Sequence, residues 1–442
     1  MDVHHLLLCV AVSLCLVRVS HQDPNESRLR DELLKDYNPL VRPVKNYSDP
    51  LTVKIGFTLV QILDLDEKNQ ILTTNAWMTL EWTDTLLQWD SKKYNGIDIV
   101  RMPSRQIWRP DILLYNSGTE GFDTTHDVHI LVSENGHCYQ LPPAIFKSVC
   151  KVDVRWFPFD VQTCKLKLGS WTHSGKLIEL KSGDLFLSEY TESNEWDLVE
   201  TSQKMTKVFY ECCPNDPYPD VTYTLVLRRR SLFYGLNLII PCVLLSTLAV
   251  VVFLLPVDSG AKISLGVTVL LCFMVLLLMV SEVIPATSDS VPLIAQYLIA
   301  TMIIVGLSII ATVVVLHLHH HDPRGKKMPK WAREFLLKWC ARLFQMKNPD
   351  CGQVEQAGED VNLISKGEGT VEPEVGKILE EVRYITKHLR AKEVTENVHS
   401  EWKFAASVLD RLFLVFFSIL MILVTLVILL SAPRHGTTSL KS

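Results

Sequence analysis

The sequence predicts an outer all-β domain, an immunoglobulin-like sandwich with a short N-terminal helix, joined to a four-helix transmembrane bundle with helical cytosolic segments. Three observations carry this prediction. Apolar and polar residues alternate along several short stretches of the N-terminal half, as in half-buried strands. Four long apolar runs lie in the C-terminal half, each close to the ~20 residues that cross a hydrocarbon core. Hydrophobic residues make up 48% of the 442-residue chain, and its mean hydropathy is +0.17.

Composition excludes several classes of protein. Charged residues are only 21% of the chain and the net charge is −5, which excludes a disordered chain and a nucleic-acid binder driven by positive charge. The 19 Gly and 21 Pro are too few for a fibrous repeat. The chain has no G-x-S-x-G, H-E-x-x-H, P-loop or C-x-x-C motif. We therefore expect no enzyme, no cofactor, no bound metal and no nucleic-acid partner.

Residues 1–20 are predicted to be a secretory signal, because the apolar run Leu6–Val17 is too short to span a bilayer. Residues 21–231 would then form an extracellular domain in an oxidising compartment. Two N-glycosylation sequons, at Asn25 and Asn46, both lie within the first 50 residues, which supports this placement.

The apolar runs place three spans within residues 232–316 and a fourth at residues 411–431. Residues 317–410 then form a cytosolic linker, and residues 432–442 an extracellular tail. Eight Lys and Arg residues follow the third span, as the positive-inside tendency predicts. Arg228–Arg230 favours the opposite orientation, but we give the signal and the cysteines more weight. We expect a multi-pass plasma-membrane protein with both termini outside.

Strands of the outer domain are indicated by strict alternation. The set Leu51, Val53, Ile55, Phe57 and Leu59 is one example, and three further stretches repeat it, namely Ala76–Trp82, Val128–Val132 and Tyr223–Leu227. Turn clusters separate them, which favours two packed sheets. Before them, Ser27–Tyr37 has the leucine spacing of a short helix.

Two residues break the in/out pattern. Trp77 shares a face with Thr79 and Glu81, and Leu131 points away from the inward set around it. An outward Trp is about as often a surface residue packed under a loop as a ligand contact. The second interpretation gains weight because large exposed apolar groups usually face a partner.

Five of the 11 cysteines belong to the outer domain, and an odd number leaves at least one thiol unpaired. Cys150 and Cys164 enclose 13 residues, and cross-linking such a loop contributes ~3 kcal/mol on the chain-entropy estimate. Cys212 and Cys213 are adjacent. A bridge between them would close a strained eight-membered ring. Two free thiols and a disulfide that stiffens the loop tip therefore remain as alternatives. Cys138 then stays free.

The cytosolic linker shows three patterns. Pro329–Phe344 predicts an amphipathic helix along the inner lipid surface, with one apolar side formed by Trp331, Phe335, Leu336, Trp339 and Leu343. Cys351–Pro373 is rich in Gly and Glu and is expected to be disordered. Glu374–Arg411 has helical spacing and should continue into the fourth span. His319–His321 is better explained by solvation than by metal binding.

Specific motifs carry a family resemblance. Between Cys150 and Cys164 the chain reads Trp156-Phe157-Pro158-Phe159-Asp160, and four spans follow. This resembles the Cys-loop pentameric ligand-gated ion channels. Tyr210-Glu211-Cys212-Cys213 is similar to the alpha-subunit signature of nicotinic acetylcholine receptors. Three further stretches resemble the neuronal, homopentamer-forming alpha-seven type: Trp108–Asn116, Pro285–Pro292 and Lys377–Tyr384.

The resemblance implies a pentameric ring in a postsynaptic membrane, with disulfides Cys150–Cys164 and Cys212–Cys213. It also implies acetylcholine or a related quaternary ammonium agonist, which aromatic faces bind at ~2 kcal/mol or more per desolvated contact. The implied principal face comprises Tyr115, Trp171, Tyr210, Cys212, Cys213 and Tyr218. The implied complementary face comprises Trp77, Leu131 and Leu141. One chain carrying both faces permits a homopentamer without requiring one, so a heteropentamer with related subunits stays open.

The second span carries a stripe at 4-3-4-4 spacing, formed by Ser264, Thr268, Leu271, Val275 and Met279. In the resembled family this stripe lines the pore, and Leu271 and Val275 would form a dewetting gate. Asp258 and Glu282 are the candidate selectivity acids. Ala261 stands where cation-selective members usually have Glu. We expect a cation channel with reduced calcium preference.

The candidate coupling residues are Glu67, Phe157, Pro158, Phe159, Asp160, Arg229 and Pro292. Two other departures from the family pattern are His173-Ser174 after Trp171 and a cysteine tip one residue longer than in vertebrate alpha-seven types. The hypothesis is an acetylcholine-gated cation channel subunit. The alternatives are a non-conducting auxiliary subunit of a heteropentamer and an anion-conducting member.

Overall fold

The structure, a computed structural model, describes residues 23–257, 260–285, 290–320, 328–346 and 373–431. The predicted signal, Asp258, most of the segment expected to be disordered and the tail lie outside the described residues. The described chain forms two compact units. The first, called the β unit, comprises residues 23–153 and 160–230, and the second, called the helical unit, comprises residues 154–159 and those from 231 onward.

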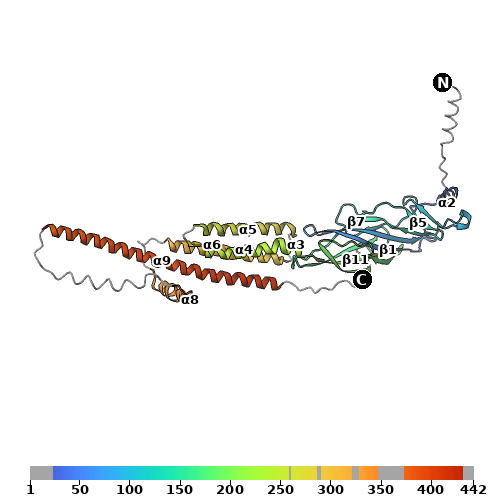
Figure 1. The fold of residues 1–442 in the computed structure, drawn as a ribbon. Coiled ribbons are helices and arrows are strands. Elements are labelled where there is room, and N and C mark those ends of the chain that lie inside the picture. Colours follow the sequence, from blue (N-terminus) through green and yellow to red (C-terminus); the bar gives the residue numbers. More distant parts are fainter. Residues whose placement is uncertain (1–22, 258–259, 286–289, 321–327, 347–372, 432–442) are drawn as a thin grey trace, which may run out of the picture. The chain divides into compact units, whose positions relative to one another are not determined.

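The β unit begins with helix α2 (Pro24–Leu34) and then forms two sheets (Figure 1). The larger sheet runs in the order β3-β5-β6-β2-β1-β9, with β7 paired to β2, and the smaller runs β10-β11-β8-β4. Strand bounds in the larger sheet are β1 Leu51–Asp66, β2 Ile71–Thr83, β3 Ile99–Met102, β5 Ile130–Ser133, β6 His137–Gln140, β7 Pro143–Val149 and β9 Ile178–Phe186. Those in the smaller are β4 Ile112–Leu114, β8 Val161–Ser170, β10 Trp196–Tyr210 and β11 Cys213–Arg229. A 3-10 turn, η1 (Ser91–Tyr94), precedes β3.

The core lies between the two sheets, as the alternation predicts. Ile55 and Phe57 of β1 are fully buried, and so is Tyr223 of β11. Phe57 stacks on the Tyr223 ring at a centroid distance of 5.0 Å, and the Tyr223 hydroxyl donates to the Ile55 carbonyl at 2.8 Å. The predicted sandwich with an N-terminal helix is confirmed. Val128 is an exception, because it precedes β5 and is only half-buried.

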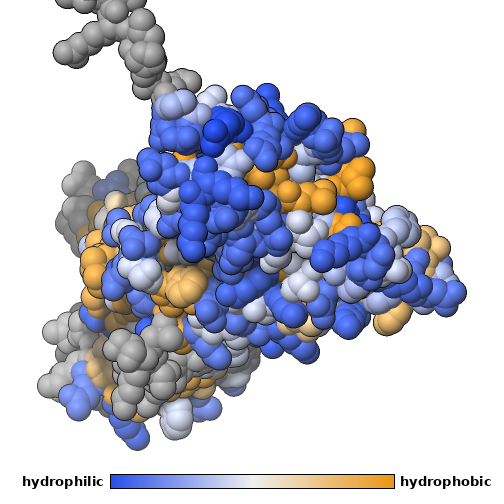
Figure 2. All heavy atoms as spheres, turned by 90° about the vertical axis from the view of Figure 1, so that its right-hand side faces the viewer, coloured by the Kyte–Doolittle hydropathy of each residue, from blue (hydrophilic) through white to orange (hydrophobic). Residues whose placement is uncertain are grey.

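The outer surface of the sandwich is mostly hydrophilic, with small apolar patches, in the end-on view of Figure 2. Alternation along the strands explains this, since each residue that enters the core places its polar neighbours outside. Such a surface suits a domain surrounded by water.

Within the described ranges, four helical segments are long and apolar enough to cross a membrane: Leu232–Leu254, Ala261–Val283, Leu293–His319 and Val398–Ile428. The first consists of α3 (Leu232–Tyr234), η2 (Gly235–Ile239), α4 (Ile240–Val251) and η3 (Val252–Leu254). The second and third are α5 and α6. The fourth belongs to α9 (Pro373–Ser431), one continuous helix of 59 residues. These helices run side by side (Figure 1).

The amphipathic segment of the linker consists of α7 (Lys330–Ala332), η5 (Arg333–Cys340) and α8 (Ala341–Leu343). Its small residues pack on α9, and Leu336 packs with them against Trp402. Trp331, Phe335 and Trp339 stay exposed. Placing Leu336 with the exposed aromatics was therefore wrong. The reason is that η5 has π geometry, which departs from the α-helical spacing assumed from the sequence.

Candidate functional site

Four aromatic side chains of the β unit gather where strands of the smaller sheet end. Tyr115 follows β4, Trp171 follows β8, and Tyr210 and Tyr218 belong to the β10–β11 hairpin. The Tyr115 and Trp171 rings meet edge to face at 5.9 Å, and the Tyr210 and Tyr218 rings at 5.7 Å. Trp171 is 54% exposed and Tyr210 is 42% exposed, so large aromatic surfaces remain open to a ligand.

Gly169 explains how Tyr115 reaches this cluster. A Cβ atom at Gly169 would lie 2.7 Å from Cζ and the hydroxyl oxygen of Tyr115, so only glycine leaves room for the ring to cross β8. The Tyr115 hydroxyl donates to the Ser170 carbonyl at 2.5 Å. Burial raises the pKa of Tyr115 well above its usual range, and nearby Tyr210 and Asp111 add to the effect. Tyr115 is therefore a neutral hydrogen-bond donor.

Asp111 holds the loop that carries Trp171. Its carboxylate accepts from the Ser170 hydroxyl at 2.5 Å and from both the Thr172 amide, at 2.7 Å, and the Thr172 hydroxyl, at 2.6 Å. Its carbonyl accepts from the Trp171 amide at 3.2 Å. His173 Nδ1 lies 3.1 Å from the same carboxylate. Burial opposes ionisation, but these hydrogen bonds hold the pKa of Asp111 below its usual range.

Three residues that matter here were not selected from the sequence. Asp111 lies within the stretch Trp108–Asn116 that carries the family resemblance and Gly169 lies outside such stretches, but in both cases a contact between strands leaves no local pattern in the sequence. Phe122 is the third, since its ring lies 5.5 Å from that of Trp171. His173, seen as a departure from the family pattern, is part of the Asp111 hydrogen-bond network.

The cysteine tip connects β10 to β11. Cys212 and Cys213 are thiols in the structure, with their sulfur atoms 2.8 Å apart, so the bridge between them stays a prediction. The tip is tied to the segment after Trp171, because Gly175 donates its amide to the Pro217 carbonyl at 2.7 Å and Lys176 pairs with Asp216 at 2.8 Å.

The residues expected on the complementary face lie on the larger sheet. Trp77 of β2 and Leu141 after β6 line a cavity of about 390 Å³, together with Thr79, Tyr139 and Gly183. Leu131 of β5 pairs with Tyr139 in the sheet. None of the four clustered aromatics lines this cavity. The aromatic cluster and the cavity beside Trp77 are therefore separate features of a single chain.

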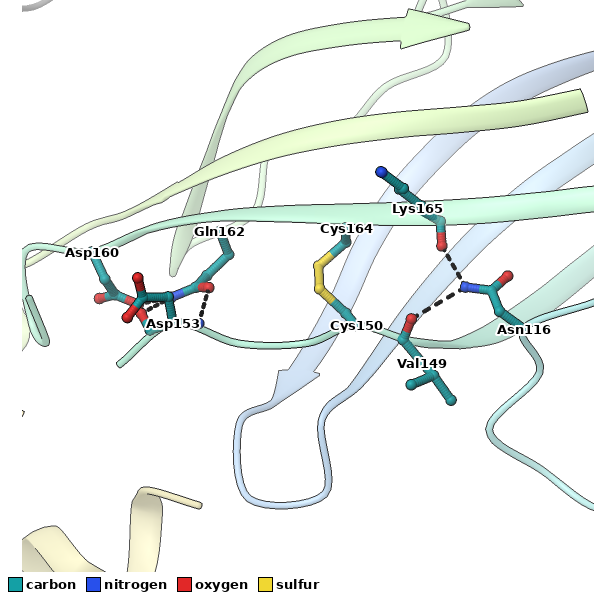
Figure 3. The surroundings of a disulfide bond; sticks show 8 residues. All are labelled: Asn116, Val149, Cys150, Asp153, Asp160, Gln162, Cys164 and Lys165. Atoms are coloured by element: carbon teal, nitrogen blue, oxygen red, sulfur yellow. Dashed lines mark hydrogen bonds between the residues drawn. A yellow bond between two sulfur atoms is a disulfide. The ribbon is translucent and has the colours of Figure 1, made fainter. Parts of the chain in front are cut away.

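The Cys150–Cys164 disulfide is present, with an S–S distance of 2.00 Å (Figure 3). Asn116, the neighbour of Tyr115, donates to the carbonyls of Val149 at 3.1 Å and Lys165 at 2.7 Å. These are the residues next to the two cysteines. The disulfide therefore joins Cys150 to β8, the strand whose Lys165 and Ser170 carbonyls accept hydrogen bonds from Asn116 and Tyr115. Cys138 is a buried free thiol, and burial raises its pKa well above the usual range.

Arg229 forms a buried charged cluster at the end of β11. Its guanidinium contacts Asp160 at 2.8 Å, Glu67 at 2.6 Å and Glu195 at 3.2 Å, and stacks 4.2 Å over the Trp196 ring. The Arg229 side chain is 0% exposed. Burial raises the pKa of Glu67, and the charge of Arg229 acts in the opposite direction.

The remaining coupling candidates belong to the helical unit. The segment Val154–Phe159 groups with the helices. The Phe157 ring meets Tyr234 at 5.1 Å, while Pro158 and Phe159 line a small apolar cavity with Leu293. Pro292 caps α6.

The stripe on α5 lies on the open side of the helical unit. Leu271, Val275 and Met279 are 60%, 57% and 58% exposed. Ser264, Thr268 and Glu282 are exposed as well, and so is Ala261 at the first position of the helix. Asp258 lies outside the described residues. In the described part of the chain, no group of three or more His, Cys, Asp or Glu side chains is arranged to hold a metal ion.

Comparison with known families gives two matches. Residues 26–231 match the neurotransmitter-gated ion-channel ligand binding domain. Residues 238–370 and 351–429 match the neurotransmitter-gated ion-channel transmembrane region. The two together cover nearly all of the β unit and of the four spans.

Similarity to individual proteins supports these two family matches. Acetylcholine receptor subunit alpha-1-A of Xenopus laevis is 39% identical over 429 residues, which cover 93% of this chain and 94% of the relative. Acetylcholine receptor subunit alpha-type acr-16 of Caenorhabditis briggsae is 37% identical over 488 residues, covering 96% and 98%. Neuronal acetylcholine receptor subunit alpha-2 of Homo sapiens is 39% identical over 466 residues, covering 92% and 88%. With two family matches and relatives of this similarity, the chain belongs to the Cys-loop nicotinic acetylcholine receptor alpha-type subunits, a family of ion-channel subunits and not of enzymes.

Proposed function

We propose that this chain is a subunit of an acetylcholine-gated cation channel of the plasma membrane. The observation that carries the proposal is the open aromatic cluster of Tyr115, Trp171, Tyr210 and Tyr218. A quaternary ammonium nitrogen has no N–H to donate, so ring faces are the groups that can recognise its charge. An edge-to-face pair at 5.9 Å beside a second pair offers several such faces to one ligand.

The agonist binds between two copies of the chain. The aromatic cluster supplies the principal face, with Cys212 and Cys213 at the covering tip. The cavity lined by Trp77 and Leu141, with Leu131 in the strand paired to Tyr139, supplies the complementary face of the next copy. Support for this arrangement is that the aromatic cluster and the cavity beside Trp77 are separate and belong to different sheets of one chain. Such a head-to-tail contact closes into a ring, here a homopentamer of the alpha-seven type.

The exposed stripe on α5 lines the pore. Five copies of Leu271 and Val275 close it by excluding water, and Glu282 supplies an acidic ring at the outer end. Ala261 leaves the inner mouth without carboxylates next to the start of α5, so calcium preference is reduced. The N- and C-termini lie outside the cell, with glycans on Asn25 and Asn46.

Opening is coupled to binding through the Arg229 cluster and the Phe157–Phe159 tip. A cluster in which several carboxylates surround one cationic side chain can switch between two arrangements of its ion pairs. Arg229 contacts three carboxylates, which fits this role. The exposed aromatics of the segment Lys330–Leu343 lie against the inner lipid surface.

Recording from cells that express only this chain tests the function. We expect acetylcholine to evoke a current whose reversal potential follows sodium when external ions are replaced, with a small calcium contribution. Surface-labelled protein without current would favour the auxiliary subunit of a heteropentamer. A reversal potential that follows chloride would make the chain an anion-conducting member instead.

A further inference from the structure

Lys262 and Asp410 form a buried ion pair that the agonist site and the pore stripe do not use. Lys262 is the second residue of α5, and Asp410 lies on α9. The Nζ atom of Lys262 is 2.6 Å from Oδ2 of Asp410, and the two side chains are only 1% and 9% exposed. Charges so far from water persist only when paired, so each residue depends on the other.

The surroundings of the pair are apolar. Ala406 and Phe413 lie one helical turn to either side of Asp410, and both pack with Val257 and Val315. Oδ1 of Asp410 has no hydrogen-bond partner among the described residues. Lys262 is thus the polar contact that holds the Asp410 carboxylate in place.

The pair lies on the side of α5 that faces away from the exposed stripe. Lys262 shares its face with Gly266, Val269 and Phe273, all buried at spacings of 4, 3 and 4 residues. At 3.6 residues per turn, Ser264 is rotated about 200° from Lys262. The ammonium group of Lys262 therefore points away from the helix face that Ser264 and the rest of the stripe form.

This direction matters because Ala261, directly before Lys262, is exposed and carries no charge. In a ring of five chains, a lysine with a free side chain would extend its flexible stem to the water of the inner mouth. Five ammonium groups there would repel entering cations, and no carboxylate at position 261 would offset them.

We propose that Asp410 is a selectivity-determining residue. In each of the five chains it pairs with Lys262 on the side of α5 that faces away from the pore, and so keeps the lysine charge out of the cation pathway. The inference rests on the proposed function, since it takes α5 as the pore-lining helix. It assigns to the fourth span, remote from the pore stripe, an electrostatic role in conduction.

Single-channel recording of acetylcholine responses tests this role in cells that express the full chain alone. In Asp410→Asn the lysine loses its counter-charge, and we expect the unitary cation conductance to fall about twofold or more, with a higher relative chloride permeability. An unchanged conductance and an unchanged permeability ratio in a variant that reaches the surface would overturn the assignment.

The matched control is the double variant Lys262→Met with Asp410→Asn. It removes both charges, which is far less disruptive than leaving one buried charge alone. We expect it to conduct like the original chain, because the pair presents no net charge to the pore. A clear rise in its cation conductance would show that Lys262 already acts on the pore in the original chain, and would contradict the proposal.

If Asp410→Asn alone does not reach the surface, a rise in the cation conductance of the double variant still contradicts the proposal. A wild-type chain that reaches the surface without any acetylcholine current would contradict the proposed function itself. A wild-type current with an unchanged Asp410→Asn variant would contradict only the role of Asp410. The two failures are therefore distinguishable.

Discussion

Trp171→Ala is expected to weaken acetylcholine binding by at least about 30-fold, which corresponds to the ~2 kcal/mol of a desolvated cation–π contact. Trp171 is the most exposed ring of the aromatic cluster, and it touches both Tyr115 and Phe122. Its removal takes away the largest face available to the ammonium group. Displacement of a labelled quaternary ammonium ligand from membranes measures the loss.

Folding and assembly should survive this substitution. The side chain of Trp171 is more than half exposed, and the loop is held by Asp111 through the Thr172 side chain and backbone atoms that alanine retains. Size-exclusion chromatography of the solubilised protein checks the oligomer. Trp171→Phe is the matched control, because it keeps an aromatic face and should lose far less affinity. Unchanged binding in Trp171→Ala would mean that the ligand binds elsewhere.

Arg229→Ala is expected to prevent most of the chain from reaching the cell surface. It removes the cation from a cluster in which Asp160 is 2% exposed, and stranding a buried charge costs about 3–5 kcal/mol. That is a large share of the ~5–15 kcal/mol by which a domain is stable. Surface biotinylation of the expressed chain measures the effect.

The neighbouring residue provides the control. Arg228 pairs with Asp197 at 3.3 Å, with side chains 27% and 33% exposed, so Arg228→Ala should cost less than about 1 kcal/mol. Arg229→Lys should lie between the two, since lysine keeps the charge but loses the planar fork and the stacking on Trp196. Normal surface expression of Arg229→Ala would show that the cluster is not required for folding.

The fold was predictable because it follows from local periodicity. The alternation from Leu51 to Leu59 identifies one buried face of β1, and the long apolar runs identify the spans. The aromatic cluster was predictable in part, since Tyr115 and Tyr210 stand in the motifs that carry the family resemblance, and that resemblance also implied Trp171 and Tyr218.

Contacts between distant positions were not predictable in this way. Asp111 accepts a hydrogen bond from Thr172, which lies 61 residues away in the sequence. Lys262 donates one to Asp410, which lies 148 residues away. Nothing in the neighbouring sequence of either residue indicates its partner. Gly169 is similar, because the need for glycine arises from the Tyr115 ring crossing another strand. Leu336 was misplaced because π geometry changed the helical spacing.

The central claim is that the aromatic cluster binds its ligand through the positive charge of a quaternary ammonium group. The most direct test compares acetylcholine with 3,3-dimethylbutyl acetate, the uncharged analogue in which carbon replaces the nitrogen, at the unmodified protein. Because the two have nearly the same shape, loss of the cation–π contact predicts an affinity for the analogue that is lower by about 30-fold or more. Equal affinities for the two ligands would contradict the claim.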